Sequence, residues 1–523
     1  MTDTTAALLW LAPIAYVAAG VIALIVGPRR GWWLAEAVAI GVAAATLTVA
    51  GEAIFRVANN DTADGVGLSM TLLITVLGWV IVRFSRRYLT GEPHQGRYIV
   101  TLMGTLAAVA VVTLSQHLGL LVAAWIASSL SLHGLLIYYS DRPAALASAH
   151  KKFLASRLAE LCLVGALGLA YWEAGSLELT WLAAYGHEGA TLPPVLHAAM
   201  VLIALAGIFK SAQLPVHGWI LQVMEAPTPV SALLHAGVVN LSGFVLIRLA
   251  EPLSAAPIAQ ALLVVVGGLT AALAALVMMT RVSIKVRLAW STCSQMGFML
   301  LECGLGLYEL ALLHLIAHSA YKAHAFLASG DTVLTTRQHA FLPPVDRSAP
   351  YRQFAGRLAA APVAILLLLA VSLAWQQLDS GLTLPTVAVI IVGLGLAPLL
   401  WPEADRPARA FGRGTVTILA LAHLYLLWHV LFAAMAPMPE KAASPILVAW
   451  AVLLFLALYT AQTLIVLVPE SRVCQALRRW AVAGFFLDEM FTRLTFRVWP
   501  LRMPQEARET PATSPSVLPG EPS

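Results

Sequence analysis

Long apolar stretches recur along almost the whole chain and are separated by short polar loops. A helix that crosses the hydrocarbon core of a bilayer needs about 20 mostly apolar residues, and by that rule the sequence predicts about fifteen membrane-spanning helices. We expect them at residues 6–27, 32–55, 66–83, 98–115, 118–139, 153–172, 194–225, 228–249, 256–279, 283–305, 307–329, 358–376, 383–401, 412–435 and 444–469. The pattern therefore predicts an all-α polytopic membrane protein.

The loops between these stretches alternate in charge. Basic residues follow the odd-numbered stretches, at Arg29, Arg30, Arg83, Arg86, Arg87, Arg97, Arg142, Lys151, Lys152, Arg281, Lys285, Arg287, Arg337, Arg347, Arg352, Arg472, Arg478 and Arg479. Loops after even-numbered stretches carry Asp61, Asp64, Glu173, Glu188 and Glu251. Because cytoplasmic loops collect Lys and Arg, we expect the N-terminus outside the membrane and the C-terminus in the cytoplasm.

Composition and motifs narrow the function. Only 11% of the 523 residues are charged and 59% are hydrophobic, against about a quarter charged in ordinary soluble domains, which excludes a string of soluble domains. The net charge of +5 does not indicate a nucleic-acid partner, because membrane proteins collect Lys and Arg in their cytoplasmic loops. Cys162, Cys293, Cys303 and Cys474 form no CxxC pair, and GxGxxG, Walker and HExxH motifs are absent, so we expect no cofactor and no metal.

Three segments lie outside the predicted spans. Residues 330–357 are a polar connector expected on the cytoplasmic side, and the proline-rich tail 504–523 is expected to be disordered. Residues 470–503 are expected to form an amphipathic segment that lies on the membrane surface or docks on a partner. The remaining parts are N-terminal helices at 1–117, a core at 118–329 and C-terminal helices at 358–469.

Lys210 is the clearest functional signal, because an ionisable residue inside a membrane span is costly. It follows a long apolar run and precedes Pro215, which cannot donate a backbone hydrogen bond, so the helix should break between the two. Transporters place polar backbone near an ion path with such broken helices, and a lysine there can exchange a proton. A lysine that snorkels to an interface is the alternative.

His314, His318 and Lys322 are spaced four residues apart in the stretch 307–329. In a helix each such step drifts by only about 40°, so the three side chains share one face. Histidine exchanges protons near neutral pH, and the stripe therefore indicates a proton path, with a structural role as the alternative. His235 is a further histidine inside an otherwise apolar stretch.

Glu160 is the candidate counter-charge for Lys210, although Arg157, three residues earlier, could instead hold it in a local pair. His133, Glu225 and Lys285 are weaker candidates for the same path.

Four runs carry a family resemblance: Lys210–Pro215 (KSAQLP), Met224–Ala236 (MEAPTPVSALLHA), Ile284–Gly297 (IKVRLAWSTCSQMG) and Leu313–Gly330 (LHLIAHSAYKAHAFLASG). They resemble the signature of the antiporter-like membrane subunits, which include subunit L of NADH:quinone oxidoreductase and the large subunits of multi-subunit sodium/proton antiporters. The resemblance implies a fold of inverted repeats with a broken seventh helix. It also implies that Lys210 is the central proton-carrying lysine, with His235, His318 and Lys322 on the connecting polar axis.

The departures from the family are specific. The family places a glutamate directly after the tryptophan of the fifth span, but here Trp125 precedes Ile126. Glu160 aligns with another acidic position of the family, and His133 lies one heptad beyond Ile126. The stretch 358–376 holds no lysine and no acidic residue, so the second repeat is degenerate and the outer half of the path must differ or be lost. Residues 470–523 are too short for the long lateral helix of subunit L.

A shortened antiporter-like subunit with these losses resembles the DabB subunits of bacterial inorganic carbon transporters. This resemblance implies a multi-pass protein of the inner membrane that carries protons, with sodium as the alternative. It also implies a large soluble DabA partner on the cytoplasmic side, whose carbonic-anhydrase-like zinc site would hydrate CO2, so that this chain is a transporter subunit and not an enzyme. Partner contacts are expected at Arg478, Arg479, Phe485, Phe486, Asp488 and Glu489.

Two other functions compete with this one. A subunit of a respiratory or cation/proton antiporter complex is disfavoured by Ile126 and by the missing lysine in 358–376. A membrane anchor that has lost conduction is disfavoured by the retained Lys210 and by the histidines and lysine of the polar axis.

Overall fold

The computed structural model describes residues 3–58, 64–186, 192–330, 350–377, 384–401, 407–435, 439 and 443–500. Within these ranges the chain is helical and forms no strand, apart from one isolated β-bridge between His117 and Glu178. Eleven of the described helices are long and apolar enough to cross a membrane. The predicted all-α membrane fold is therefore confirmed.

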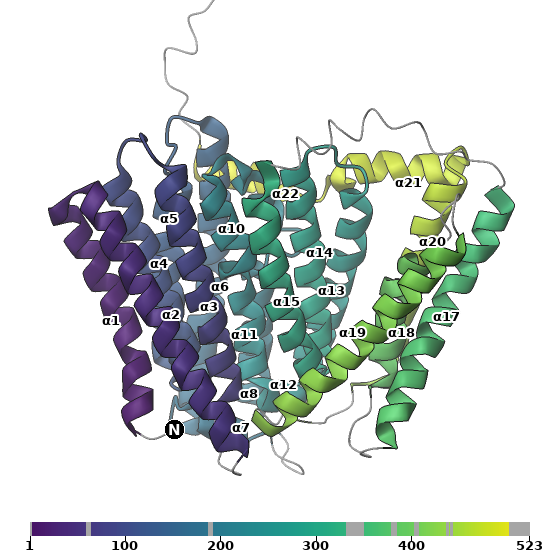
Figure 1. The fold of residues 1–523 in the computed structure, drawn as a ribbon, viewed down its shortest axis with the longest axis horizontal. Helices are drawn as coiled ribbons and strands as arrows, with labels where there is room; N and C mark the ends of the chain where they lie inside the picture. The colour runs from purple at the N-terminus through teal and green to yellow at the C-terminus, as the bar shows by residue number, and fades with distance from the viewer. Residues whose placement is uncertain are drawn as a thin grey trace, which may run out of the picture.

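The first fifteen helices form one bundle (Figure 1). They are α1 (Asp3–Val26), α2 (Pro28–Ala58), α3 (Gly65–Tyr88), α4 (Gln95–Leu114), α5 (Leu118–Leu136), α6 (Pro143–Ala174), α7 (Leu179–Ala184), α8 (Pro194–Lys210), α9 (Gly218–Gln222), α10 (Thr228–Ala236), α11 (Leu241–Arg248), α12 (Ala250–Ser254), α13 (Pro257–Met278), α14 (Ile284–Gly304) and α15 (Tyr308–Leu327). Short 3-10 turns lie at Val223–Glu225 and Val238–Asn240.

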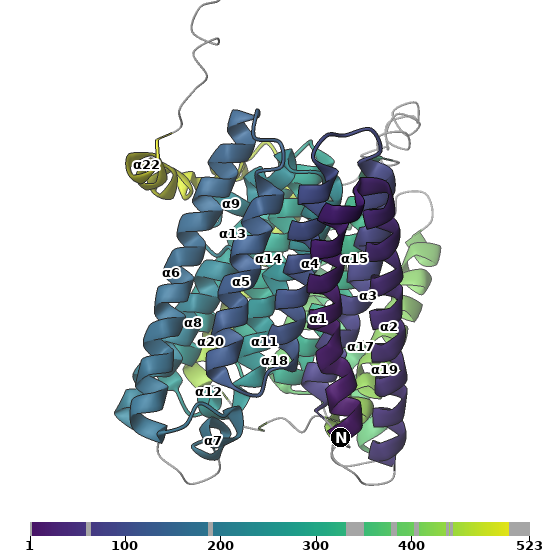
Figure 2. The same ribbon diagram turned by 90° about the vertical axis from the view of Figure 1, so that its left-hand side faces the viewer.

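Four further helices lean against one side of this bundle, and two short ones cross its end (Figure 1). The first group is α17 (Pro350–Gln376), α18 (Thr386–Leu396), α19 (Pro407–Met435) and α20 (Pro445–Leu467), and the crossing pair is α21 (Arg472–Val482) and α22 (Glu489–Val498). 3-10 turns lie at Ala397–Leu400 and Gly484–Phe486. We call the end crossed by α21 and α22 the C-segment end and the opposite end, where the N-terminus lies, the N-terminal end. Figure 2 shows α22 lying beside the first turns of α6.

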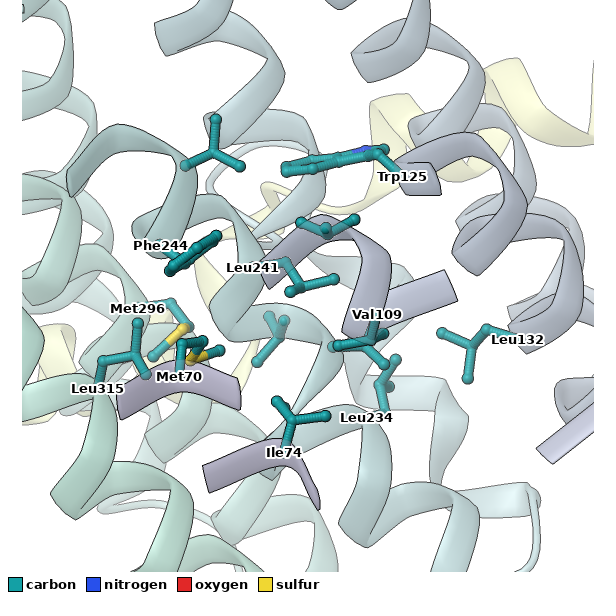
Figure 3. Packing of buried hydrophobic residues seen from close by; sticks show 14 of the residues in the cluster. Met70, Ile74, Val109, Trp125, Leu132, Leu234, Leu241, Phe244, Met296 and Leu315 are labelled. Carbon is teal, nitrogen blue, oxygen red and sulfur yellow. The ribbon is translucent and has the colours of Figure 1, made fainter. Parts of the chain in front are cut away.

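Two apolar cores match this division. One runs through α1–α15 and includes Trp125, Phe244 and Met296, which pack together in Figure 3. The other lies within α17–α20. Large apolar side chains such as Ile25 and Trp172 remain more than 80% exposed on the outside of the bundle, as expected for surfaces that face lipid rather than water.

Three boundaries depart from the sequence-based expectations. Residues 331–349 of the expected connector and the whole tail 504–523 lie outside the described residues, while residues 350–357 already belong to α17. Lys151 and Lys152 were expected in a cytoplasmic loop, but α6 begins at Pro143 and both lysines lie inside it, buried. The helix expected at 228–249 is interrupted at Gly237, whose backbone is not helical.

Candidate ion path

Lys210 is the last residue of α8, and the chain leaves the helix over Ser211–His217 before α9 begins. The break therefore falls between Lys210 and Pro215, as predicted. Only 3% of Lys210 is exposed, and its Nζ lies 4.9 Å from the centre of the Trp125 ring. Among the described residues the Nζ has no hydrogen-bond partner. A buried ammonium without such a partner is unusual, because buried polar groups are nearly always hydrogen-bonded by protein or water.

Glu160 pairs with Arg157 at 2.7 Å and is 5% exposed. This is the local pair that the sequence left open. Glu160 makes no hydrogen bond to Lys210, so the two charges can interact only through space.

A second buried lysine lies near this group and was not identified as a site residue from the sequence. Lys152 donates to the carbonyl oxygen of Ser129 at 2.8 Å and to its hydroxyl at 3.1 Å, and its charge is coupled to those of Lys210 and Glu160. His133 packs its ring against Phe153 at 5.3 Å and lies in the field of Lys152. The signal in the sequence was the adjacent pair of lysines eight and nine residues after Pro143. A helix that begins at this proline contains both lysines, whereas a later start would leave them in the loop.

His235 begins a connected polar series that ends at Lys322. Its Nδ1 lies 3.1 Å from the hydroxyl of Thr292, which donates to the Leu288 carbonyl oxygen at 3.1 Å. Lys322 donates to the same carbonyl at 3.0 Å and to the hydroxyl of Ser291. The His235 ring also stacks on Phe326 at 4.4 Å. The structure therefore connects His235 and Lys322 through one turn of α14.

The stripe on α15 continues this series toward the N-terminal end. The His314 and His318 rings are 6.1 Å apart, and His318 is 5% exposed with neither ring nitrogen hydrogen-bonded to the described residues. His314 lies 2.8 Å from Glu302 and 2.7 Å from the side-chain oxygen of Gln295. Glu302 was missed from the sequence, although an acidic residue inside the apolar stretch 283–305 was a signal of the same kind as Lys210.

The weaker candidates lie near the C-segment end. Glu225 is exposed in the turn after α9, and Lys285 donates to the Thr228 hydroxyl at 3.0 Å. Within the described ranges no group of three or more His, Cys, Asp or Glu side chains could hold a metal ion.

The residues expected to bind a partner divide into two sets. Arg478, Arg479, Phe486 and Glu489 are exposed, and Phe485 is half-buried. Asp488 instead turns inward and accepts from the buried Lys151 at 2.8 Å.

Comparison with known proteins connects this geometry to a family. The family described as NADH:quinone oxidoreductase/Mrp antiporter, TM, matches residues 115–374. A chain of the Mrp complex from Dietzia sp. DQ12-45-1b shares the fold, with a TM-score of 0.58 and 22% identity over 96% of this chain and 61% of that chain. The antiporter-like fold predicted from the motifs is thus confirmed.

Comparison with individual proteins identifies the family more closely. The probable inorganic carbon transporter subunit DabB of Hydrogenovibrio crunogenus is 40% identical over 84% of this chain and 83% of the relative. The probable inorganic carbon transporter subunit DabB2 of Halothiobacillus neapolitanus is 37% identical over 88% of this chain and 83% of the relative. Subunit L of the Escherichia coli NADH-quinone oxidoreductase is 33% identical, over 54% of this chain and 46% of the relative. The chain is therefore a multi-pass, antiporter-like membrane protein that belongs to the DabB family of inorganic carbon transporter subunits.

Proposed function

We propose that the chain is the proton-translocating membrane subunit of a complex that accumulates inorganic carbon, CO2 or bicarbonate, at the expense of an ion gradient. The observation that carries the proposal is Lys210: a buried lysine at a helix break, without a hydrogen bond to the described residues. Such a group exchanges protons with water more readily than one held in a direct ion pair, because no hydrogen-bonded anion holds its charged form; the Glu160 carboxylate, its proposed counter-charge, acts only through space.

The path from Lys210 is completed by groups that share the bundle interior. His235, Thr292 and Lys322 are joined through the Leu288 carbonyl, and His318 lies one helical turn before Lys322 on α15. Buried ionisable residues of membrane proteins that lie in series in this way are typical of proton relays.

Inorganic carbon is favoured over a respiratory role by the extent of the similarity. The two DabB relatives are matched over 83% of their length, whereas the Escherichia coli subunit L is matched over 46%. We infer a location in the bacterial inner membrane, with the C-segment end in the cytoplasm, because Arg472, Arg478 and Arg479 lie there.

The partner that the family implies is a DabA-like soluble subunit with a zinc site, which would carry out CO2 hydration. The exposed side chains of α21 and α22 at the C-segment end are the surface we assign to it. Trp480, Phe486 and Met490 are each more than half exposed there, and aromatic residues, Met and Arg are enriched at protein interfaces.

The proposal is tested in cells that depend on the complex for growth in air. Lys210→Ala should reduce bicarbonate accumulation at least tenfold while the amount of protein in the membrane stays unchanged, since removing a charge from a span makes insertion easier. The matched control is Arg287→Ala, which removes an exposed cation and should retain activity. Near-normal accumulation in the Lys210 variant would contradict the proposal.

A further inference from the structure

Glu302 is the most deeply buried carboxylate near the polar series. Its side chain is 1% exposed, in the last turn of α14 at the N-terminal end of the bundle. Oε2 lies 2.8 Å from Nδ1 of His314, and Oε1 has no hydrogen-bond partner among the described residues. A buried carboxylate with one unpartnered oxygen needs a proton or water to complete its hydrogen bonds.

The hydrogen bonds of His314 indicate that this pair holds an exchangeable proton. Nδ1 faces the carboxylate, and Nε2 faces the side-chain oxygen of Gln295 at 2.7 Å. Both ring nitrogens therefore face acceptor oxygens, and a neutral imidazole has only one N–H to donate. With the Gln295 amide in this orientation, the ring carries an extra proton or Glu302 is protonated and donates to Nδ1.

We propose that Glu302, with His314, is the proton-holding site of the outer half of the ion path. This inference rests on the proposed function and deepens it, because it supplies the half-path for which the stretch 358–376 has neither a lysine nor an acidic residue. A proton enters at Oε1 of Glu302, the proton on Oε2 passes to Nδ1 of His314, and Nε2 of the ring releases its own proton toward His318. The pair takes up one proton and releases one, so its charge is restored. Because the two ring centres are 6.1 Å apart, this last transfer needs a bridging water molecule.

The route from Glu302 to the outer surface passes between the bundle and α19. Glu309, in the first turn of α15, is 18% exposed and is bonded to His429 of α19. Tyr425, which also belongs to α19, lies one helical turn before His429. Tyr425 lines a cavity of about 220 Å³ whose walls come from α15, α17, α18 and α19. The leaning helix group thus meets the bundle beside the proposed site.

The remaining wall of that cavity is apolar and is formed by leucine, valine and alanine side chains such as Leu310, Leu313 and Ala388. An apolar wall of this kind stays dry where no polar group is near. Tyr425 is the polar side chain of this lining, so we place the proton route on its side of the cavity.

The test uses the complete complex in membranes and three variants of this chain. Glu302→Gln keeps the size and the hydrogen-bonding capacity of the side chain but cannot ionise. We expect it to reduce bicarbonate accumulation at least tenfold with unchanged membrane content. Glu302→Asp keeps the carboxylate and should recover part of that loss. Glu173→Gln makes the same substitution near the outer end of α6 and should leave accumulation within twofold of the parent.

Infrared difference spectra of the purified protein after a pH jump show whether the Glu302 carboxyl group itself changes protonation, which a purely structural role would not require. A carboxyl band that changes with pH should disappear in Glu302→Gln and remain in Glu173→Gln. Retained accumulation in Glu302→Gln, or an unchanged carboxyl band, overturns the inference. If Lys210→Ala also retains accumulation, the proposed function fails as well; if only the Glu302 variants are active, the proposed function stands and this site does not.

Discussion

Lys151, buried in α6, binds Asp488 of the C-terminal segment at 2.8 Å across 337 positions of sequence. The lysine side chain is wholly inaccessible, while that of Asp488 is 27% exposed. Thr492 also donates to the Asp488 carboxylate, at 3.1 Å. Asp488 therefore attaches the segment α21–α22 to α6, the helix that also carries Glu160.

The first prediction concerns this attachment. Asp488→Asn removes the charge that compensates Lys151 and should weaken docking by about 1–3 kcal/mol, equivalent to a 5- to 150-fold increase in the undocked population. Limited tryptic digestion measures it, because Arg478, Arg479 and Arg493 are exposed sites within the segment. The double variant Lys151→Met/Asp488→Leu should restore protection, since replacing both members of a buried pair with apolar residues is tolerated. Equal digestion of Asp488→Asn and the parent would show that other contacts hold the segment.

The second prediction concerns Gly218, the first residue of α9. A Cβ built on this glycine would lie 1.6 Å from Oδ1 of Asp488. Gly218→Ala must therefore displace the carboxylate, and we expect the same accelerated digestion as for Asp488→Asn. Gly168 in α6 has no atom within 4 Å of its added Cβ, so Gly168→Ala is the matched control and should digest at the parental rate. A protected Gly218→Ala variant would mean that Asp488 has room to rotate without leaving Lys151.

The sequence predicted the parts of this protein that depend on local physics. Apolar length identified the all-helical, membrane-spanning character of the chain, because lipid leaves no alternative for the backbone. Pro215 identified the break beside Lys210, and the four-residue spacing placed His314 and His318 on one face. The pairing of Lys151 with Asp488 could not be predicted, because nothing in either local segment encodes a contact 337 residues away.

Two other departures have equally physical causes. The interruption at Gly237 requires a glycine, since an added Cβ would meet the Leu233 carbonyl oxygen at 2.8 Å and Leu77 at 3.4 Å, and the second of these contacts comes from another helix. Arg157 and Glu160 were predicted as one of two possible pairings, and only the tertiary position of Lys210, over Trp125, shows which one forms.

The third prediction separates the two roles of Glu160. Glu160→Gln leaves the Arg157 guanidinium without its 2.7 Å partner and removes a negative charge from the field at Lys210. We expect bicarbonate accumulation to fall at least tenfold, whereas Glu225→Gln, at an exposed turn, should cause little change. In the double variant Arg157→Gln/Glu160→Gln the unpaired guanidinium is gone, so a purely local role for Glu160 predicts recovery. We expect the double variant to stay impaired, because Lys210 still lacks its counter-charge; recovery would assign Glu160 to Arg157 alone.

The fourth prediction concerns the partner surface on α21. Cys474 and Ala481 of this helix are buried, whereas Arg478 and Arg479 are exposed. Reversing both charges, Arg478→Glu/Arg479→Glu, should therefore leave the segment docked through Asp488 and alter only its outer face. If that face binds the soluble partner, copurification of the partner should fall at least tenfold at low salt, where exposed charges act most strongly.

Deletion of residues 474–523 gives the complementary result but also leaves Lys151 unpaired. It should therefore be made in the Lys151→Met background, where we expect a stable membrane protein without its partner. Deletion of 504–523 alone should leave copurification unchanged. The alternative is a segment that lies on anionic lipid: in that case charge reversal would lower binding of the purified subunit to vesicles containing phosphatidylglycerol while the partner still copurifies. Retention of the partner by both the reversed and the deleted variants would exclude α21 and α22 from the interface.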